Sequence, residues 1–472
     1  MNKQESIIII GAGLCGSLLA LRLAQRGYKV RLYESRSDLR KVDISSGRSI
    51  NLALSARGFK ALQLARIKEK VIKICVPMYG RMVHDVQGSS FASNYSGREG
   101  EYINSVSRGK LNEVLLNEVE KHKNVSIYFN AECISVDIEK GIVYLKDNKN
   151  YREFSASADV IFGADGAGSV LRKSYFLSKK FLFNLNQAYL THGYKELEIP
   201  SDTEGKYKIS KNYLHIWPQD NYMLIALPNL NGSFTVTLFL GLKTGKYSFK
   251  NLISQKKISY FFKTQFNSVF GLISDIASQF VNNPTGVLGT VKCSPWHYKG
   301  KTLLIGDAAH AVVPFYGQGM NASFEDITVL DKVLDKWQGN WEKVFKAYQQ
   351  ARKQDTDAIA DLAIENYREM RNHVSKPLFK QKRKIEMNLE KTFPTQYFSK
   401  YSMVSFNENT GYHQAMIKGR AQDKALLSII SSNTFSATDK FTKKQLISLL
   451  EKVQNKTNQI LEKTKTADTH YI

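Results

Sequence analysis

The sequence predicts an α/β fold whose first unit binds a dinucleotide, and three observations support this. A strand–helix–strand pattern with a glycine motif opens the chain, two later apolar strands end in Asp-containing turns, and the chain from 341 onward shows mainly helical patterns. The length of 472 residues allows about two to four domains. Ordinary globular usage, with 43% hydrophobic and 23% charged residues, excludes collagen, disorder and a small disulfide scaffold.

The opening unit begins with a β-branched run at 7–10 that is typical of a buried parallel strand. A helical segment follows, stops at Gly27 and leads into a second strand at 29–33. This order of elements predicts a βαβ unit.

A Gly-x-Gly-x-x-Gly motif lies between the first strand and its helix. Gly11 permits the tight turn, Gly13 lets the backbone approach a pyrophosphate, and Gly16 lets helix and strand pack closely. The helix N-terminus stabilises phosphate charge. Glu34, at the end of the second strand, is placed to accept hydrogen bonds from ribose hydroxyls.

Two later segments indicate which dinucleotide binds. The strand at 160–163 runs into an Asp-Gly turn, and the strand at 303–305 runs into Gly306 and Asp307. Asp307 can bind a ribityl or ribose hydroxyl, and the glycine-rich stretch 317–321 can approach a flavin ring. A second Gly-x-Gly-x-x-Gly is absent from the sequence, so NAD(P)H would visit transiently or not be used.

The net charge of +24 (67 basic minus 43 acidic residues) raises the question of a polyanionic partner. Basic residues are spread along the whole chain, with one dense run at 376–384 that holds five basic and no acidic residues. We interpret this run as solvated surface. The basic amphipathic helix predicted at 440–465 is expected to dock on the body of the protein, with membrane-surface association left open.

The four cysteines show neither a Cys-x-x-Cys pair nor metal-ligand spacing, which predicts free thiols in a reducing cytosol and no metal site. The longest uncharged stretch, 221–242, contains Pro228 and Gly232 and is predicted to form two strands and a turn rather than a membrane span. We therefore expect a soluble, cytoplasmic protein.

The glycine and aspartate signals together resemble the single-component FAD-dependent aromatic hydroxylases of the para-hydroxybenzoate hydroxylase type. The resemblance runs from about residue 7 to about 410. It becomes closest to the kynurenine 3-monooxygenases at five stretches, 47–55, 80–84, 306–326, 366–371 and 401–404.

The resemblance implies an enzyme that binds FAD and uses NADPH and O2 to hydroxylate L-kynurenine to 3-hydroxy-L-kynurenine. This reaction belongs to tryptophan degradation by the kynurenine pathway and to NAD biosynthesis via quinolinate. NADPH would reduce the flavin, O2 would add to give a flavin C4a-hydroperoxide, and the electron-rich ring would attack its distal oxygen.

Other functions are weighed against this one. The nearest alternative is an FAD-dependent hydroxylase of another aromatic substrate, since a simple phenol needs no amino-acid clamp. A flavin halogenase is disfavoured because its Trp-x-Trp-x-Ile-Pro stretch is absent. A nucleic-acid-binding protein with a vestigial nucleotide fold would show steep salt-dependent binding; we expect no nucleic-acid partner.

Arg81 and Tyr95 are the first candidates for substrate binding. Arginine offers a carboxylate a planar fork that lysine lacks. Arg81 lies in a predicted strand, and the segment 91–95 can return antiparallel, so that a three-residue loop would place Tyr95 opposite Arg81 on the same face. The spacing alone is also consistent with an ordinary contact between two surface strands. The resemblance implies that both residues bind the carboxylate of kynurenine.

The long helix predicted at 341–374 carries Asn366 and Met370 on one face. The resemblance implies that Asn366 binds the amino-acid end of the substrate and that Met370 packs on the ring side. It also makes Tyr401 the second substrate tyrosine, although its segment, 398–406, alternates weakly and could be ordinary core.

Aromatic residues provide further candidates. Phe234, in a predicted strand, and Phe315 are interpreted as pocket walls or plain core, and Tyr316 is a weaker candidate of the same kind. His310 is interpreted as a packed structural histidine rather than a catalytic base.

The expected FAD contacts combine the motif residues with positions that match the family. Cys133 would contact adenine through its backbone, and Met320 and Asn321 would offer backbone groups to the flavin pyrimidine. The full set is Gly11, Gly13, Cys15, Gly16, Glu34, Arg36, Ala53, Arg108, Cys133, Asp307, Gly319, Met320 and Asn321.

The fold class that results is a Rossmann-type FAD-binding domain interleaved with a mainly antiparallel β-sheet substrate domain, plus a helical C-terminal region. The FAD-binding domain is assigned to 1–75, 100–178 and 290–340, the substrate domain to 76–99 and 179–289, and the helical region to 341–472. The expected partners are L-kynurenine, NADPH and O2, and the sequence leaves the oligomeric state open, a homodimer included.

Overall fold

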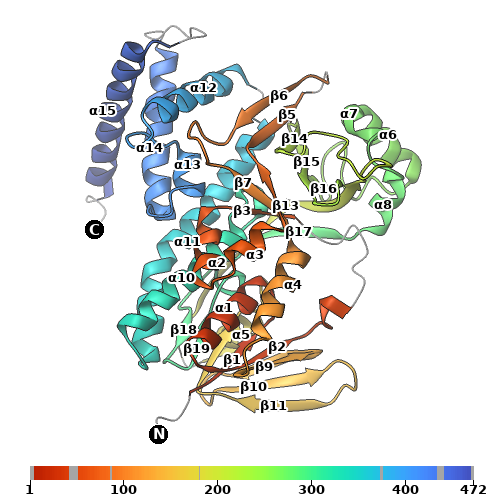
Figure 1. Ribbon diagram of the computed structural model, residues 1–472, viewed down its shortest axis with the longest axis vertical. Coiled ribbons are helices and arrows are strands. Elements are labelled where there is room, and N and C mark those ends of the chain that lie inside the picture. The colour runs from red at the N-terminus through yellow and green to blue at the C-terminus, as the bar shows by residue number, and fades with distance from the viewer. Residues whose placement is uncertain are drawn as a thin grey trace.

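The structure is a computed structural model that describes residues 5–41, 51–85, 88–179, 181–372, 376–432 and 441–468. Figure 1 shows a sheet with covering helices at the bottom of the molecule, a second sheet at the upper right and a group of helices at the upper left. The predicted fold class, α/β with a helical C-terminal region, is confirmed.

The first sheet has six strands in the order β18-β19-β12-β1-β2-β8, and all neighbours except β18 and β19 pair in parallel. Its strands are β1 (Ser6–Ile10), β2 (Lys29–Glu34), β8 (Val125–Phe129), β12 (Val160–Gly163), β18 (His297–Tyr298) and β19 (Thr302–Leu304). The β-branched run of β1 is buried at the centre, as expected of a parallel strand covered on both faces.

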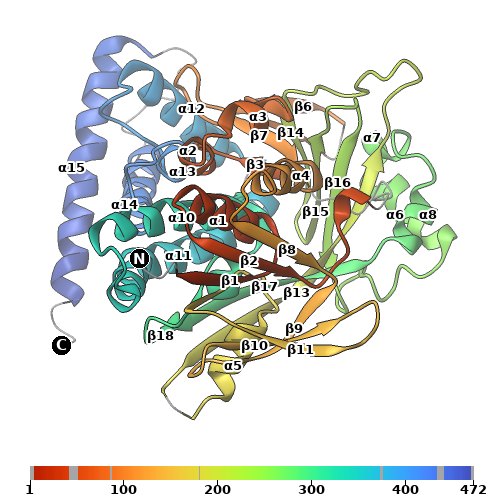
Figure 2. The ribbon, with the colours of Figure 1, turned by 60° about the horizontal axis from the view of Figure 1, so that its bottom comes forward.

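Helices α1 (Leu14–Gln25), α4 (Arg108–Val119) and α10 (Gly319–Lys336) pack together beside this sheet. Helix α1 joins β1 to β2, so the predicted βαβ unit is present. A three-stranded antiparallel sheet of β9 (Ala131–Asp137), β10 (Ile142–Asp147) and β11 (Glu153–Ser157) lies together with α5 (Val170–Leu177) at one edge, as Figure 2 shows.

A second small sheet has three strands in the order β3-β7-β4. Its strands are β3 (Asn51–Leu54), β4 (Cys75–Met78) and β7 (Ile103–Ser107), with α2 (Ala56–Leu64) and α3 (Lys68–Ile72) between β3 and β4. Of the stretch 47–55 that carries part of the family resemblance, residues 47–50 lie outside the described residues.

The second large sheet has seven strands in the order β17-β13-β16-β15-β14-β5-β6, antiparallel except for β14 and β5. Its strands are β5 (Gly80–His84), β6 (Ser90–Asn94), β13 (Asn184–Ile199), β14 (Tyr213–Gln219), β15 (Tyr222–Pro228), β16 (Phe234–Gly241) and β17 (Thr285–Ser294). Helices α6 (Gln255–Gln265), α7 (Asn267–Phe270) and α8 (Ile276–Asn282) form one apolar core with this sheet.

The register of the β5–β6 hairpin differs from the prediction by two residues. Arg81 pairs with Ser93, and Tyr95 follows the strand, where its N–H donates to the carbonyl of Tyr79. The reason is that the turn is centred one residue earlier in the sequence: Asp85 and Ser89 close it, with the N–H of Asp85 donating to the carbonyl of Ser89 and the N–H of Ser89 donating to the side chain of Asp85. A shift of two residues keeps side chains on the same face, so Arg81 and Tyr95 still meet, with the guanidinium carbon 5.9 Å from the ring centre.

The helical region consists of α11 (Trp341–Asn372), α12 (Pro377–Thr392), α13 (Lys400–Ser405), α14 (Tyr412–Ser431) and α15 (Lys443–Asp468). The segment at 398–406 therefore forms a short helix, capped by Ser399. Helix α15 buries Leu446, Leu450 and Val453 against α12 and α14, which confirms that the basic tail helix docks on the protein itself. Among the described helices, none is long and apolar enough to cross a membrane.

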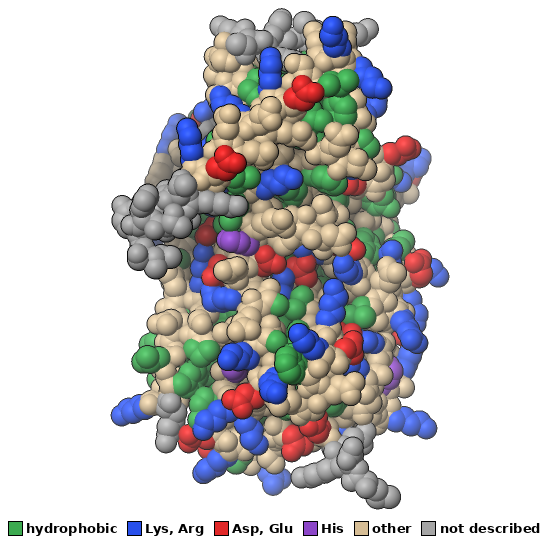
Figure 3. All heavy atoms as spheres, turned by 90° about the vertical axis from the view of Figure 1, so that its left-hand side faces the viewer, with side chains coloured by type: hydrophobic (Ala, Val, Ile, Leu, Met, Phe, Trp, Pro, Cys, Tyr) green, Lys and Arg blue, Asp and Glu red, His purple; other side chains and the backbone are tan. Residues whose placement is uncertain are grey.

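The basic run 376–384 is only partly solvated surface. The expectation holds for Lys376, Lys380 and Lys384, which are exposed, and is wrong for Lys382 and Arg383. Lys382 is buried and pairs with Asp423 at 2.8 Å and Glu386 at 3.0 Å, and Arg383 pairs with Glu386 at 3.1 Å. Elsewhere, on the face seen in Figure 3, Lys and Arg side chains are spread among Asp and Glu side chains rather than gathered in one patch.

Candidate functional site

A cavity of about 830 Å³ lies between the glycine turn of the six-stranded sheet and the seven-stranded sheet. One end is lined by the glycine motif, β2 and the start of β9, and the other by β15, β16, β17 and the loop 311–317. The site is therefore built from segments of both sheets that are distant in sequence.

The glycines at the first end meet the steric demands predicted for them. Gly11 has a φ of +96°, and a Cβ there would lie 2.6 Å from the carbonyl oxygen of Ala164. A Cβ on Gly16 would lie 1.9 Å from the carbonyl oxygen of Gly11. A Cβ on Gly13 would meet nothing within 4 Å, because this residue faces the open cavity.

Glu34 lies at the end of β2 and lines the same end of the cavity. Its carboxylate accepts hydrogen bonds from the N–H of Ala12 at 2.8 Å and from Nε of Arg36 at 2.7 Å. Burial alone would raise the pKa of Glu34, but the bonds to Arg36 and Ala12 lower it below the usual range. The carboxylate is thus charged and available to accept hydrogen bonds from sugar hydroxyls.

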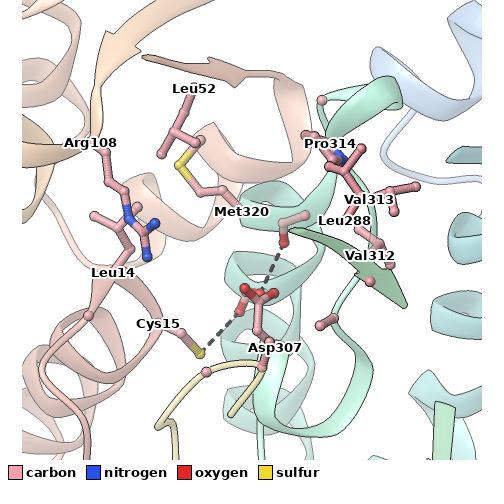
Figure 4. A pocket seen from close by; sticks show the side chains of 18 of the residues that line it. Leu14, Cys15, Leu52, Arg108, Leu288, Asp307, Val312, Val313, Pro314 and Met320 are labelled. Carbon is pink, nitrogen blue, oxygen red and sulfur yellow. Dashed lines mark hydrogen bonds between the residues drawn. The ribbon is translucent and has the colours of Figure 1, made fainter. Parts of the chain in front are cut away.

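Asp307 and Arg108 enter the middle of the cavity from opposite sides. Figure 4 shows Arg108, at the start of α4, and Asp307, at the start of α9 (Asp307–His310), directed toward the same space, with Leu14 and Met320 beside it. Burial raises the pKa of Asp307, and the charges of His310 and Arg108 partly offset this. An acceptor and a cation therefore face each other across the space that a dinucleotide would cross.

The turn that carries Asp307 is held by the buried carboxylate of Asp326 on α10. This carboxylate accepts from the N–H of Gly306 at 3.1 Å, from Nε2 of His310 at 2.6 Å and from Nε of Arg352 at 2.7 Å. Burial would raise the pKa of Asp326, yet the charges of His310 and Arg352 lower it. The interpretation of His310 as a structural residue agrees with this contact.

A second cavity, of about 550 Å³, adjoins the first. It lies between the β5–β6 hairpin, the end of α11 and α12. Both cavities are lined by the same four side chains, Arg81, Tyr95, Tyr316 and Tyr401, which therefore form the wall between them.

The four residues of this wall form a cationic centre among aromatic rings. The rings of Tyr95 and Tyr401 stack at 5.3 Å, those of Tyr316 and Tyr401 at 5.4 Å, and the guanidinium carbon of Arg81 lies 4.9 Å from the centre of the Tyr401 ring. Nε of Arg81 is buried and has no hydrogen-bond partner, and the nearest carboxylate, that of Glu369, is 3.8 Å from its Nη1. A buried, under-satisfied guanidinium at a cavity wall is suited to binding an anion.

Comparison with protein families decides the identity of this arrangement. A family model described as "FAD binding domain" matches residues 4–182 and 289–363. The chain is 43% identical over 405 residues to the kynurenine 3-monooxygenase of Myxococcus xanthus (strain DK1622), covering 86% of each chain, and 41% identical over 470 residues to that of Dictyostelium discoideum, covering 97% of this chain and 99% of the relative.

The chain belongs to the kynurenine 3-monooxygenase family. It is a flavin-dependent aromatic monooxygenase. Solved structures agree at the level of the fold: 2-methyl-3-hydroxypyridine-5-carboxylic acid oxygenase has a TM-score of 0.65 at 20% identity, covering 82% of this chain and 98% of that chain. The p-nitrophenol 4-monooxygenase of Pseudomonas putida DLL-E4 has a TM-score of 0.64 at 17% identity, covering 83% and 94%.

The residues at the first end of the large cavity fit the FAD of this family. The open face of Gly13 at the start of α1 leaves room for a pyrophosphate, and the charged Glu34, which lines the same end, could accept hydrogen bonds from a ribose. Among the described residues, no group of three or more His, Cys, Asp or Glu side chains could hold a metal ion. The expected contacts that line this cavity are Gly11, Gly13, Cys15, Glu34, Arg36, Ala53, Arg108, Cys133, Asp307, Gly319 and Met320.

Two expected cofactor residues do not line the cavity but support it. Gly16 provides the close approach of helix and strand. Asn321 is fully buried; its side chain donates to the carbonyls of Ala53 and Gly317 and accepts from the N–H of Ser55, so it joins β3 to α10.

The expected substrate residues are distributed over both cavities. Met370 and Phe315 line the first cavity, and Asn366 lines the second. The amide of Asn366 donates to the carbonyl of Phe315 at 2.7 Å and to the sulfur of Met370 at 3.3 Å, which confirms that Asn366 and Met370 share a helix face. Phe234 lines neither cavity. It faces Tyr207 and His215 and belongs to the apolar core between the sheet and α6–α8, so of the two interpretations the one as plain core applies.

Sequence reasoning did not single out three residues of the site. Phe239, on the same strand as Phe234, lines the first cavity, and the centre of its ring lies 4.9 Å from that of Phe315. Glu196, on β13, lines the same cavity. Glu369 lines the second cavity, and its position three residues after Asn366 on one helix face was the signal that could have found it.

A matched pair of glycine substitutions separates the two roles of the motif. Gly16→Ala places a Cβ against backbone, so we expect the FAD-free protein to lose thermal stability, by roughly 2 to 6 °C. Gly13→Ala should leave the FAD-free protein as stable as the wild type and weaken FAD binding at least tenfold, an effect of about 1.4 kcal/mol. Thermal unfolding and FAD titration measure both; a Gly13→Ala variant with unchanged FAD affinity would contradict the assignment.

The second prediction concerns pH. Burial raises the pKa of Glu196 to about 7, and the charge of Arg108 only partly offsets this. The folded protein therefore holds a proton that the unfolded chain releases near pH 4.5, so Glu196 destabilises the FAD-free protein progressively as pH rises from there to 7. Glu196→Gln should raise the melting temperature at pH 8, by roughly 1 to 3 °C, and leave it unchanged at pH 4. Equal effects at both pH values would refute this.

Proposed function

We propose that the chain hydroxylates L-kynurenine to 3-hydroxy-L-kynurenine, with bound FAD, NADPH as reductant and O2 as oxidant. The observation that carries the proposal is Arg81, whose Nε is buried and has no hydrogen-bond partner and whose guanidinium lies near the rings of Tyr95 and Tyr401, where the two cavities meet. Relatives named kynurenine 3-monooxygenase, at 40–43% identity over most of the chain, support the choice of substrate.

The amino-acid end of kynurenine matches the charges at the wall. Its carboxylate would accept from Arg81 and from the hydroxyls of Tyr95 and Tyr401. Burial raises the pKa of both tyrosines, so that both hydroxyls keep their protons and can donate. Its ammonium group would face Glu369 and the side-chain oxygen of Asn366 in the second cavity. Binding would also relieve the imperfect pairing of Arg81 with Glu369, which leaves the two groups 3.8 Å apart.

The aromatic end of kynurenine would extend into the first cavity, where we expect FAD to bind. Met370, Phe315 and Phe239 line that cavity near the wall and offer apolar surfaces to an aminophenyl ring. An apolar wall excludes water from the reacting atoms, which suppresses wasteful side reactions. FAD, when bound, supplies the oxygen chemistry, and the protein residues fix which carbon of the ring faces it.

Substrate-stimulated oxidation of NADPH tests this function. With the FAD-loaded enzyme we expect L-kynurenine to accelerate NADPH consumption and to give 3-hydroxykynurenine in proportion, measured by absorbance and chromatography. Stimulation by simple phenols without stimulation by L-kynurenine would instead indicate a hydroxylase of another aromatic substrate.

Arg81 variants test the clamp. Arg81→Ala should raise the KM for L-kynurenine about 10- to 100-fold, because a charge-assisted hydrogen bond is lost, while bound FAD stays at the wild-type level. Arg81→Lys keeps the charge but loses the planar pair of donors, so its KM should lie between those of the wild type and Arg81→Ala. Steady-state kinetics and the flavin spectrum decide; an Arg81→Ala enzyme with wild-type KM would rule the clamp out.

A further inference from the structure

We infer that Glu390 is a positioning residue whose buried carboxylate fixes Tyr95 and Tyr401 relative to each other. The inference rests on the proposed function, since it assigns Glu390 a part in building the site that binds the substrate carboxylate. Glu390 lies on α12, does not line either cavity described above and therefore acts through the backbone that carries the two tyrosines.

The carboxylate of Glu390 accepts one backbone hydrogen bond from near each of the two tyrosines. One carboxylate oxygen, Oε2, accepts from the N–H of Gly97 at 3.0 Å, two residues after Tyr95. The other, Oε1, accepts from the N–H of Ser399 at 2.8 Å, two residues before Tyr401. One side chain thus joins two segments that lie about 300 positions apart in the sequence.

Other residues of α12 contact the segment that carries Tyr95, and Arg98 connects that segment to the chain that follows α12. Arg383 donates to the carbonyls of Asn94 and Tyr95, and a Cβ on Gly97 would lie 2.2 Å from the carbonyl oxygen of Met387. Arg98 donates to the carbonyls of Pro394 and Tyr397. The helix backbone therefore lies directly on the segment after Tyr95.

The charge state of Glu390 suits this function. Its side chain is fully buried, and Nη1 of Arg98 lies 3.4 Å from its Oε1. Burial would raise the pKa of Glu390, but the charge of Arg383 and the bonds from Gly97 and Ser399 lower it. An ionised acceptor makes stronger hydrogen bonds to backbone N–H groups than a neutral one does.

The consequence for binding follows from the stacking of the two rings. Tyr95 and Tyr401 stack with 10° between their planes, and both rings contact the Arg81 guanidinium. Their hydroxyls can bind one carboxylate only if the two backbone segments keep their spacing. A displacement of about 1 Å in such a site costs up to about 100-fold in rate or affinity.

The test compares Glu390→Gln and Glu390→Asp with Asp331→Asn in the FAD-loaded enzyme. The amide of Gln directs an NH2 group at one of the two backbone N–H groups, and Asp is too short to reach both. Asp331 is a matched control, because its buried carboxylate accepts from Arg22 and Arg26 between α1 and α10, away from the tyrosines.

We expect Glu390→Gln to raise the KM for L-kynurenine about tenfold and to change kcat less than about threefold, with wild-type FAD content. Glu390→Asp should give a smaller rise in KM, and Asp331→Asn should lower thermal stability without changing KM. If Glu390→Gln does not accumulate as FAD-bound protein, the Asp variant decides alone.

Two results would overturn the inference: an unchanged KM in the Glu390 variants, or an equal rise in KM in Asp331→Asn, which would reduce the effect to general destabilisation. A wild-type enzyme that does not respond to L-kynurenine would contradict the proposed function instead. The wild-type and variant measurements therefore separate the two failures.

Discussion

The structure depends on one buried carboxylate, that of Asp326. It holds the Gly306 turn on the cofactor side and Arg352 of α11 on the other. Arg352 pairs in turn with Glu325, which pairs with Arg57, and Arg57 donates to backbone carbonyls at the end of α13 and beyond it. Because a buried charge without a partner costs several kcal/mol, about 3–5 when one partner is removed, this chain of ion pairs fixes the FAD-binding domain to α11 and α13, the helices that carry Met370 and Tyr401.

That connection explains why the site lies where three regions meet. The glycine turn and Glu34 come from the first βαβ unit and provide the features that a dinucleotide needs. Arg81 comes from the seven-stranded sheet, whereas Met370 and Tyr401 come from α11 and α13. None of these regions forms a complete site alone, so the spacing between them decides whether a zwitterionic substrate can reach from one cavity into the other.

Sequence reasoning succeeded where the determinants are local. The glycine motif and the long helix α11 follow from spacing within a few turns of chain, and both are present in the structure. It failed where a distant partner decides the outcome. The hairpin register depends on the turn closed by Asp85 and Ser89, and the burial of Lys382 depends on Asp423 of α14, which no local pattern near the basic run reveals. Part of the excess of positive charge therefore lies in buried ion pairs rather than on the solvated surface.

The most direct measurement is a comparison of L-kynurenine with its decarboxylated analogue on the wild-type enzyme and the Arg81→Ala variant, with binding followed through the flavin absorbance. If Arg81 binds the carboxylate, the wild type should prefer L-kynurenine by about 10- to 100-fold, the range set by a charge-assisted hydrogen bond. Arg81→Ala should lose most of this preference and keep only the part that the hydroxyls of Tyr95 and Tyr401 supply. A wild type without preference, or a preference that is undiminished in Arg81→Ala, would contradict the account.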